Sequence, residues 1–564
     1  MLDQRPEQQV FRRRDALRWL FSGASLAVLA ACGPVAPSPQ PPTSVPAAVP
    51  PTPIGKPTSA PTTAVAAPTQ PAATAVPAAT GQRRTGGTLR LAIPADISSM
   101  DGHTSSSILS ITVSNAFDRL VAYDVKGVPR PMLAESWDVS SDFKRLKLNI
   151  RKGVTWHNGR ALTSEDIKFN LLRGKDPKVA TGSYVNQANW FSSMETPDKH
   201  TIVMESEVSR PAVFDYFNLL NMVEPESASG PDVKSKAVGT GPFTLVDWMQ
   251  GNQIVFAKNP NYWQPGKPYV DRIVISISRD ATAMTTQLEA GAQDAVYGLS
   301  VNDFLRFKDD PKYVALLPSG QQSGLAIGMN TLFPPLDNKL VRQGLNYALD
   351  RKRFTDTVFK NIVRPLSLPW DSNSLAHEAS KENFYTFDLD KAKSLLNQGG
   401  VTEAEFDFLG SPNTPEAELI AQIYQSDLRK IGVKLNVVRL EQAAWLDQVN
   451  NRKYKGFWSA NMAVGTGEPV SGLSRGRATD PNSNNQGYKN ERYTQLIDAA
   501  ASEPDPGKRR QIYSQINDIL LDESFVSVIT TYPPKMVTSA KLHDVVTPES
   551  VPSEFYLSDA WLEA

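Results

Sequence analysis

The side chains that could carry out catalysis are few, and their surroundings do not favour it. A Gly-x-Ser-x-Gly pattern spans 472–476, with Ser474 in the position of a hydrolase nucleophile. Such a serine needs a strand before it and a helix after it, whereas Glu468-Pro469 precede this pattern and Asp480-Pro481 follow it. A hydrolase therefore remains only as an alternative function of a different class.

Metal and nucleotide chemistry are not indicated either. The histidines are widely spread and show no metal-ligand spacing. They are His103, His157, His200, His377 and His543. The only cysteine is Cys32, which excludes disulfides and a cysteine-based metal site. No phosphate-binding loop occurs, and Gly239-Thr240-Gly241 lacks the third glycine of a dinucleotide fingerprint. We expect no catalytic residue, no cofactor and no metal site.

The overall charge gives no reason to expect a nucleic-acid partner. The chain has 59 basic and 59 acidic side chains, so its formal charge is zero at pH 7. We therefore expect no nucleic acid as partner.

Residues 1–31 have the features of an export signal. Basic residues that include Arg13-Arg14 precede an uncharged run over 19–31, which is too short to span a bilayer. Leu29-Ala30-Ala31-Cys32 resembles the lipobox of a bacterial lipoprotein, in which the cysteine is acylated and becomes the new N-terminus. We predict that Cys32 is a lipid anchor, and the Arg13-Arg14 stretch is compatible with twin-arginine export.

Residues 32–85 comprise this cysteine and a linker rich in proline, alanine and threonine. Lys56 is the only charge between 33 and 82, and the composition cannot build a core. We predict a disordered, semi-rigid spacer with polyproline II character. A folded body then begins at Gly86 and contains no 18-residue apolar run.

The body has the alternating signals of a mixed α/β fold. Apolar alternation predicts strands, and periodic apolar residues with capping groups predict helices. The expected strands are 89–93, 146–150, 406–409 and 433–438. Three helices are expected: one that begins near Ile167, one at 416–431 and one at 506–522. Gly432 stands where the second helix needs a left-handed stop before the next strand, which gives a βαβ unit.

Several motifs in fixed order resemble the family 5 bacterial extracellular solute-binding proteins, which serve importers of dipeptides, oligopeptides and nickel. The first motifs are Leu133-Ala134-Glu135-Ser136-Trp137, the stretch from Leu148 to Gly159, and the stretch from Leu162 to Ile167. The later motifs are Gly239-Thr240-Gly241-Pro242-Phe243, Asn259-Pro260-Asn261-Tyr262-Trp263, the stretch from Asp337 to Gln343, and Asp388-Leu389-Asp390-Lys391-Ala392.

The resemblance implies a two-lobed, periplasmic-binding-protein-like fold of class II, with three subdomains and a hinge. Lobe one is expected at 86–118, 237–322 and 523–564, with a subdomain inserted at 119–236, and lobe two at 323–522. A ligand is then buried between the lobes, and binding favours the closed form that a transporter recognises. The implied role is an extracytoplasmic, lipid-anchored monomer that delivers a solute to ABC permease subunits.

Peptide-binding relatives use an aspartate in lobe two to pair with the α-ammonium group of the ligand. The corresponding region here is 456–469, where that aspartate has no evident counterpart. The candidate ligand-binding residues are Trp458, Asn461, Glu468 and Trp370 in lobe two, with Asp101 and His103 in lobe one. Peptides are the leading ligand class, and an oligosaccharide or a nickel chelate is the alternative.

Overall fold

The computed structural model describes residues 83–563, except 105–109, 125–126, 177, 180–186, 318–322, 413, 415, 464–466, 475, 546–554 and 556. The chain divides into two compact units, 1–79 and 80–564, and every described residue belongs to the second. The predicted signal peptide, the lipidated Cys32 and most of the linker lie outside the described residues.

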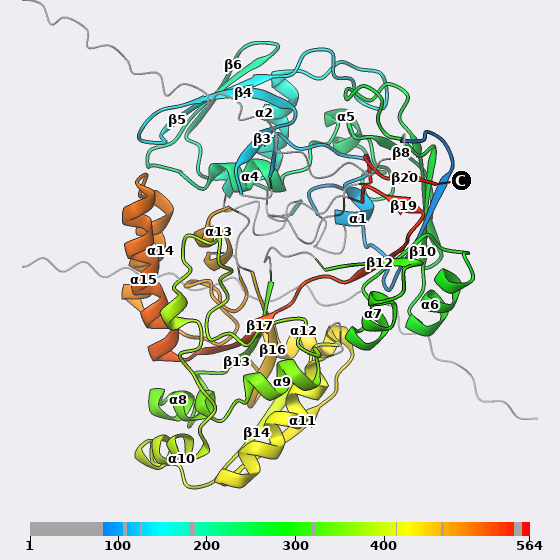
Figure 1. Cartoon of the computed structure of the whole chain (residues 1–564). Helices are drawn as coiled ribbons and strands as arrows, with labels where there is room; N and C mark the ends of the chain where they lie inside the picture. The colour runs from blue at the N-terminus through cyan, green and yellow to red at the C-terminus, as the bar shows by residue number, and fades with distance from the viewer. Residues whose placement is uncertain are drawn as a thin grey trace, which may run out of the picture. The chain divides into compact units, whose positions relative to one another are not determined.

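A seven-stranded sheet combines the first strand of the folded body with later strands up to residue 539 (Figure 1). Its order is β12 (Tyr313–Leu316), β18 (Met536–Ser539), β11 (Ala295–Tyr297), β1 (Thr88–Ile93), β10 (Arg272–Ile277), β9 (Gln253–Lys258) and β8 (Phe243–Met249). Leu89, Leu91 and Ile93 of β1 are fully buried, which confirms the strand predicted from their alternation. The nearby elements are α1 (Ser110–Val113), α6 (Ala281–Glu289), α7 (Val301–Lys308) and the pair β19 (Leu542–His543) and β20 (Trp561–Leu562).

The inserted subdomain is built on a four-stranded antiparallel sheet. Its order is β4 (Ala134–Val139), β5 (Arg145–Ile150), β7 (Thr201–Glu205) and β6 (Ser193–Asp198). The predicted helix is α2 (Ser164–Arg173), at whose start the Asp166 carboxylate accepts a hydrogen bond from the backbone N–H of Thr163 at 2.8 Å. The remaining elements are β2 (Val121–Tyr123), β3 (Pro129–Pro131), α4 (Val213–Leu219) and α5 (Pro225–Ser229).

Lobe two is built on a five-stranded sheet. Its order is β15 (Val433–Val438), β14 (Ala404–Leu409), β16 (Gly456–Ala463), β13 (Ser323–Met329) and β17 (Val526–Thr531). The flanking helices are α8 (Lys339–Tyr347), α9 (Arg351–Thr357), α10 (Leu389–Gln398), α11 (Ala417–Leu428), α12 (Gln442–Asn450), α13 (Pro469–Leu473), α14 (Glu491–Ser502) and α15 (Pro506–Glu523), with 3-10 turns at Ala379–Lys381 and Arg429–Ile431.

The predicted βαβ unit is confirmed, because β14 and β15 are parallel neighbours joined by α11. Gly432 has φ of 84°, the left-handed value that ends the helix before β15. The predicted helix at 506–522 is α15, and the Asp505 side chain caps it. On α11, Ile420 is buried, whereas the adjacent Leu419 is 46% exposed.

Two apolar clusters cover opposite faces of this sheet. Trp458 of β16 belongs to a cluster with Tyr493 and Tyr513 of α14 and α15. Phe457, the preceding residue, belongs to a cluster with Tyr424 of α11, as expected for adjacent residues of a strand.

The boundary expected at residue 523 differs from the sheet pairing. β17 pairs with β13, so 526–531 is part of the five-stranded sheet, and the chain returns to the seven-stranded sheet only at β18. The described segment 532–535 therefore joins the two sheets. Within the described ranges, no helix is both long and apolar enough to cross a bilayer.

Candidate functional site

The carboxyl ends of β14 and β16 form one side of the candidate site. The two strands are parallel, and ligands in open α/β sheets bind outside the carboxyl ends of such strands. The backbone N–H of Ser411, which follows β14, donates to Ser459 Oγ of β16 at 2.7 Å. Asn461 lies near the end of β16 and is exposed. Among the predicted ligand residues, Asn461 is therefore available to an incoming solute.

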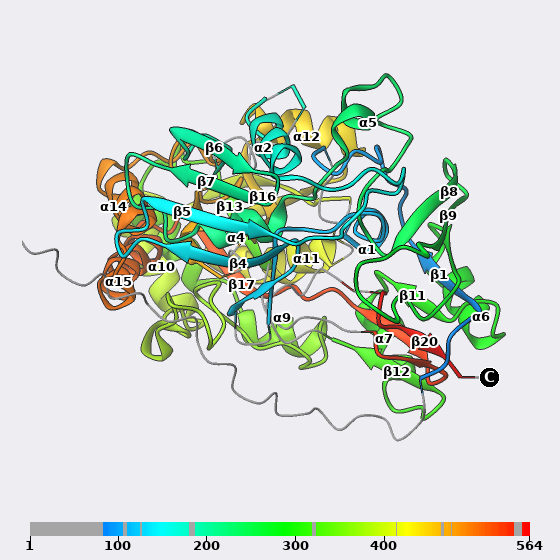
Figure 2. The same cartoon turned by 90° about the horizontal axis from the view of Figure 1, so that it is seen from above.

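The inserted subdomain reaches lobe two through Asp215 of α4. Its Oδ1 accepts a hydrogen bond from the backbone N–H of Gly467 at 2.8 Å, and its Oδ2 accepts one from Glu468 N–H at 3.1 Å. Tyr123 of β2 donates its hydroxyl to Asp215 Oδ1 at 2.6 Å, within the inserted subdomain. Figure 1 shows α4 on the side of this subdomain that faces α13, and Figure 2 shows the strands of its sheet in the order β4, β5, β7 and β6. We call these three bonds the clasp.

The carboxylate of Glu468 already has partners inside lobe two. Arg509 of α15 donates to Glu468 Oε1 at 2.8 Å, and the Tyr513 hydroxyl donates to Oε2 at 3.2 Å. Burial raises the pKa of Glu468, an effect opposed by the charge of Arg509. A ligand ammonium would have to compete with a guanidinium for this carboxylate.

Asp101 and His103 lie together in a buried network of lobe one and the inserted subdomain. Arg173 of α2 donates to both carboxylate oxygens of Asp101, at 2.9 and 2.7 Å. His103 Nε2 is 2.9 Å from the carbonyl oxygen of Asn221. Burial, followed by the charge of Arg173, lowers the pKa of His103 to about 4. The structure thus gives Asp101 an internal cation as its partner.

The two predicted tryptophans lie in the interior of lobe two. Trp370 donates its indole N–H to Asn517 Oδ1 at 2.7 Å and is 2% exposed. Trp458 is 3% exposed and packs against Trp445, with ring centroids 6.0 Å apart. Both side chains therefore contribute to the core behind the carboxyl ends of the strands.

The serine of the hydrolase-like pattern stands in a helical context. Helix α13 directly precedes Ser474. The hydroxyl of Ser474 donates to the carbonyl oxygen of Val470 at 2.7 Å. A nucleophile elbow would have a strand in place of α13. Within the described ranges, no group of three or more histidine, cysteine or acidic residues is arranged to hold a metal ion.

The contribution of α4 was not predicted from the sequence. The sequence of α4 is Val-Phe-Asp-Tyr-Phe-Asn-Leu. Its only carboxylate and its only carboxamide belong to Asp215 and Asn218, which are three residues apart. This spacing places them on one face of a helix, which was the available signal.

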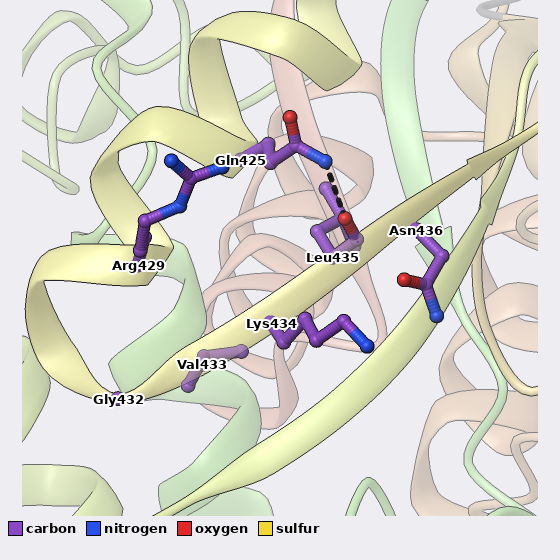
Figure 3. Close-up of a pocket in the computed structure, with 7 residues that line it drawn as sticks. All are labelled: Gln425, Arg429, Gly432, Val433, Lys434, Leu435 and Asn436. Carbon is purple, nitrogen blue, oxygen red and sulfur yellow. Dashed lines mark hydrogen bonds between the residues drawn. The ribbon is translucent and has the colours of Figure 1, made fainter.

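A separate surface cavity of about 420 Å³ lies beside β15, the edge strand of the five-stranded sheet (Figure 3). Its lining residues are Gln425, Arg429, Gly432, Val433, Lys434, Leu435 and Asn436. Gln425 donates to the carbonyl oxygen of Leu435 at 2.5 Å, and Lys434 pairs with Glu405 of β14 at 2.8 Å. This cavity contains none of the predicted ligand residues.

Residues 128–484 match the family described as bacterial extracellular solute-binding proteins, family 5. The chain belongs to this family, and the resemblance stated from the motifs is confirmed. Family 5 proteins are extracytoplasmic, bind small solutes and work with ABC permeases, so this chain is a solute-binding protein of an ABC importer.

Two relatives and two solved structures illustrate the range of ligands. Heme-binding protein A of Haemophilus influenzae is 29% identical, covering 75% of this chain and 84% of that protein. The dipeptide-binding protein of Escherichia coli is 26% identical, covering 76% and 85%.

The solved structures share the fold. The binding protein DppA of Helicobacter pylori in complex with the peptide STSA has a TM-score of 0.74 at 22% identity, covering 85% of this chain and 99% of that chain. NikZ of Campylobacter jejuni in complex with Ni(L-His) has a TM-score of 0.73 at 21% identity, covering 83% and 97%. These neighbours are two-lobed periplasmic binding proteins, so the predicted mixed α/β fold of this class is confirmed.

Proposed function

We propose that this protein captures peptides between the inserted subdomain and lobe two and delivers them to an ABC permease from a lipid anchor at Cys32. The observation that carries the capture mechanism is the clasp, in which Asp215 accepts hydrogen bonds from two backbone N–H groups across the lobes. A contact of this kind exists only in a closed form, so ligand binding and clasp formation favour each other.

The peptide ligand is supported by relatives that are named for di- and tripeptides and by the polar groups at the site. Asn461 offers an exposed carboxamide near the end of β16. Glu468 and Asp101 are each paired with a buried arginine. We therefore propose that the peptide backbone, rather than a free α-ammonium group at these carboxylates, provides most of the recognition.

Mass spectrometry of the solute retained by the purified protein tests this function. We expect one or more short peptides, whose mass is unchanged after release because we propose no enzymatic reaction. An oligosaccharide or a nickel chelate in their place would refute the peptide ligand while keeping the receptor role.

A thermal-shift panel provides the independent measurement. Peptide at 100 times its dissociation constant adds about 2.7 kcal/mol to the free energy of unfolding if it binds only the folded state. Sugars and nickel with free histidine are the comparison ligands, and stabilisation by either of them alone would contradict the proposal.

A further inference from the structure

Trp190 of the inserted subdomain packs against two apolar cores. It contacts the core of its own subdomain, which includes Phe191 and Phe217. It also contacts the lobe-two cluster that includes Tyr493 and Tyr513. These two sets of side chains leave Trp190 partly buried. Its indole therefore bridges the inserted subdomain and lobe two.

The same boundary continues at the start of α4. Ala212 is the N-cap residue of this helix and is 2% exposed. It belongs to the lobe-two cluster, whereas Val213, the next residue, belongs to the core of the inserted subdomain. Asp215 of the clasp follows in the first turn of α4 and bonds the backbone of lobe two. One short stretch of chain thus contributes both an apolar and a polar contact to lobe two.

Arg210 adds a charge to this boundary. Its guanidinium carbon is 5.4 Å from the centre of the Trp190 ring, within the range of a cation–π contact. Burial lowers the pKa of Arg210, and the negative charge of Asp498 in α14 opposes this effect. An acidic side chain of lobe two is therefore near enough to attract Arg210, in the same direction as the apolar contact of Trp190.

These contacts exist only while the inserted subdomain and lobe two are together. When the two move apart, Trp190 keeps its partners in its own subdomain but exposes the surface that faced the lobe-two cluster. Ala212 is exposed in the same way. Exposure of apolar surface to water costs free energy in proportion to its area. The contacts therefore stabilise the closed form relative to the open form, and none of them involves a solute.

We propose that Trp190 and Ala212 form an apolar latch, and that Trp190 is a positioning residue that stabilises the closed form without contacting the solute. This inference rests on the proposed capture of a solute between the lobes and extends it to the protein's own contribution to closure. A residue that acts only on the equilibrium between open and closed forms changes the affinity of every solute by the same factor. A residue that contacts the solute changes the affinities of different solutes by different factors.

The test compares Trp190→Ala with the matched control Trp137→Ala. Trp137 is also a partly buried tryptophan of the inserted subdomain, but it packs on the core of that subdomain, with its ring centroid 5.1 Å from that of Phe214. Ala212→Asp is the second variant. Aspartate is a favourable N-cap residue and is hydrated in the open form, whereas the closed form buries its charge against the lobe-two cluster. Urea unfolding checks that each variant is folded.

Two measurements are made on the parent and on each variant. The parent is first screened by native mass spectrometry against a defined library of di- to tetrapeptides, sugars and nickel with histidine. Calorimetry then gives the affinity of two different retained solutes for every protein. Energy transfer between dyes on the two lobes gives the extent of closure without solute and at one subsaturating concentration.

We expect Trp190→Ala to bind both solutes about tenfold or more weakly, as loss of a central interface tryptophan does. The factor should be the same for both solutes, and Ala212→Asp should show the same pattern. Both variants should also be less closed than the parent. Trp137→Ala should bind within about twofold of the parent, because it leaves the equilibrium between the two forms unchanged.

Two results would overturn the inference. If Trp190→Ala and Ala212→Asp bind and close as the parent does, the latch contributes nothing to closure, while the proposed function would stand. If Trp190→Ala weakens one solute and not the other, Trp190 contacts the solute and is no latch. The same comparison with a retained sugar or nickel chelate decides the latch even where the peptide ligand is refuted.

Discussion

The clasp gives a quantitative prediction for closure. Asp215→Ala removes the acceptor of two bonds that join the inserted subdomain to lobe two. Each hydrogen bond to a charged group contributes about 1.5–3 kcal/mol, so the closed form should lose about 3 kcal/mol at the lower limit. The open form has these N–H groups in water, and loss of the Tyr123 bond affects the open and closed forms alike.

This loss should appear in ligand affinity. If the ligand-free protein is mainly open, the apparent dissociation constant is inversely proportional to the closed fraction. About 3 kcal/mol then weakens peptide binding about 100-fold, since 1.4 kcal/mol corresponds to a factor of ten. Calorimetry with the retained peptide measures this change. Energy transfer between dyes on the two lobes should show less closure at any subsaturating peptide concentration.

Two variants serve as controls for Asp215→Ala. Tyr123→Phe removes only the bond inside the inserted subdomain and keeps both bonds to lobe two, so its effect should be under about tenfold. Asp138→Ala removes an acid of the same subdomain whose side chain is 76% exposed, and it should bind as the parent does. An Asp215→Ala protein that binds within twofold of the parent and closes normally would refute the role of the clasp.

Two further predictions concern the anchor and the buried histidine. A preprotein with Cys32→Ser should lose lipid modification and move from the detergent phase to the aqueous phase, and equal membrane partitioning of mutant and parent would contradict the anchor. The pKa of His103 falls from 6.5 in the unfolded chain to about 4 in the folded protein, where Asp101 and Arg173 surround it. Between these values the unfolded chain binds the extra proton, so the free energy of unfolding should decrease by up to about 3 kcal/mol as the pH falls from 6.5 to 4. His103→Gln should flatten this part of the urea-stability profile, and an unchanged slope would show that other groups cause it.

The sequence determined the class of the protein and the secondary structure around its motifs. Local signals were sufficient where neighbours in the chain decide the structure, as in the alternating Leu89, Leu91 and Ile93 or the left-handed Gly432 after α11. The ordered motifs were enough to predict the family because each is a short contiguous stretch. Cys32 and the linker remain predictions from the sequence.

Tertiary structure decided which polar groups are already paired. Asp101 meets Arg173 across 72 residues, and Asp215 meets Gly467 across 252 residues. The local pattern of apolar and polar residues cannot predict a pairing between residues so far apart in the sequence. The same limit applies to β17, whose pairing with β13 places it in the five-stranded sheet. A carboxylate in the sequence indicates only a charge. Whether an internal arginine or a backbone N–H already pairs with that carboxylate before a ligand arrives is seen only in the folded protein. Desolvation and pairing depend on groups that folding brings together.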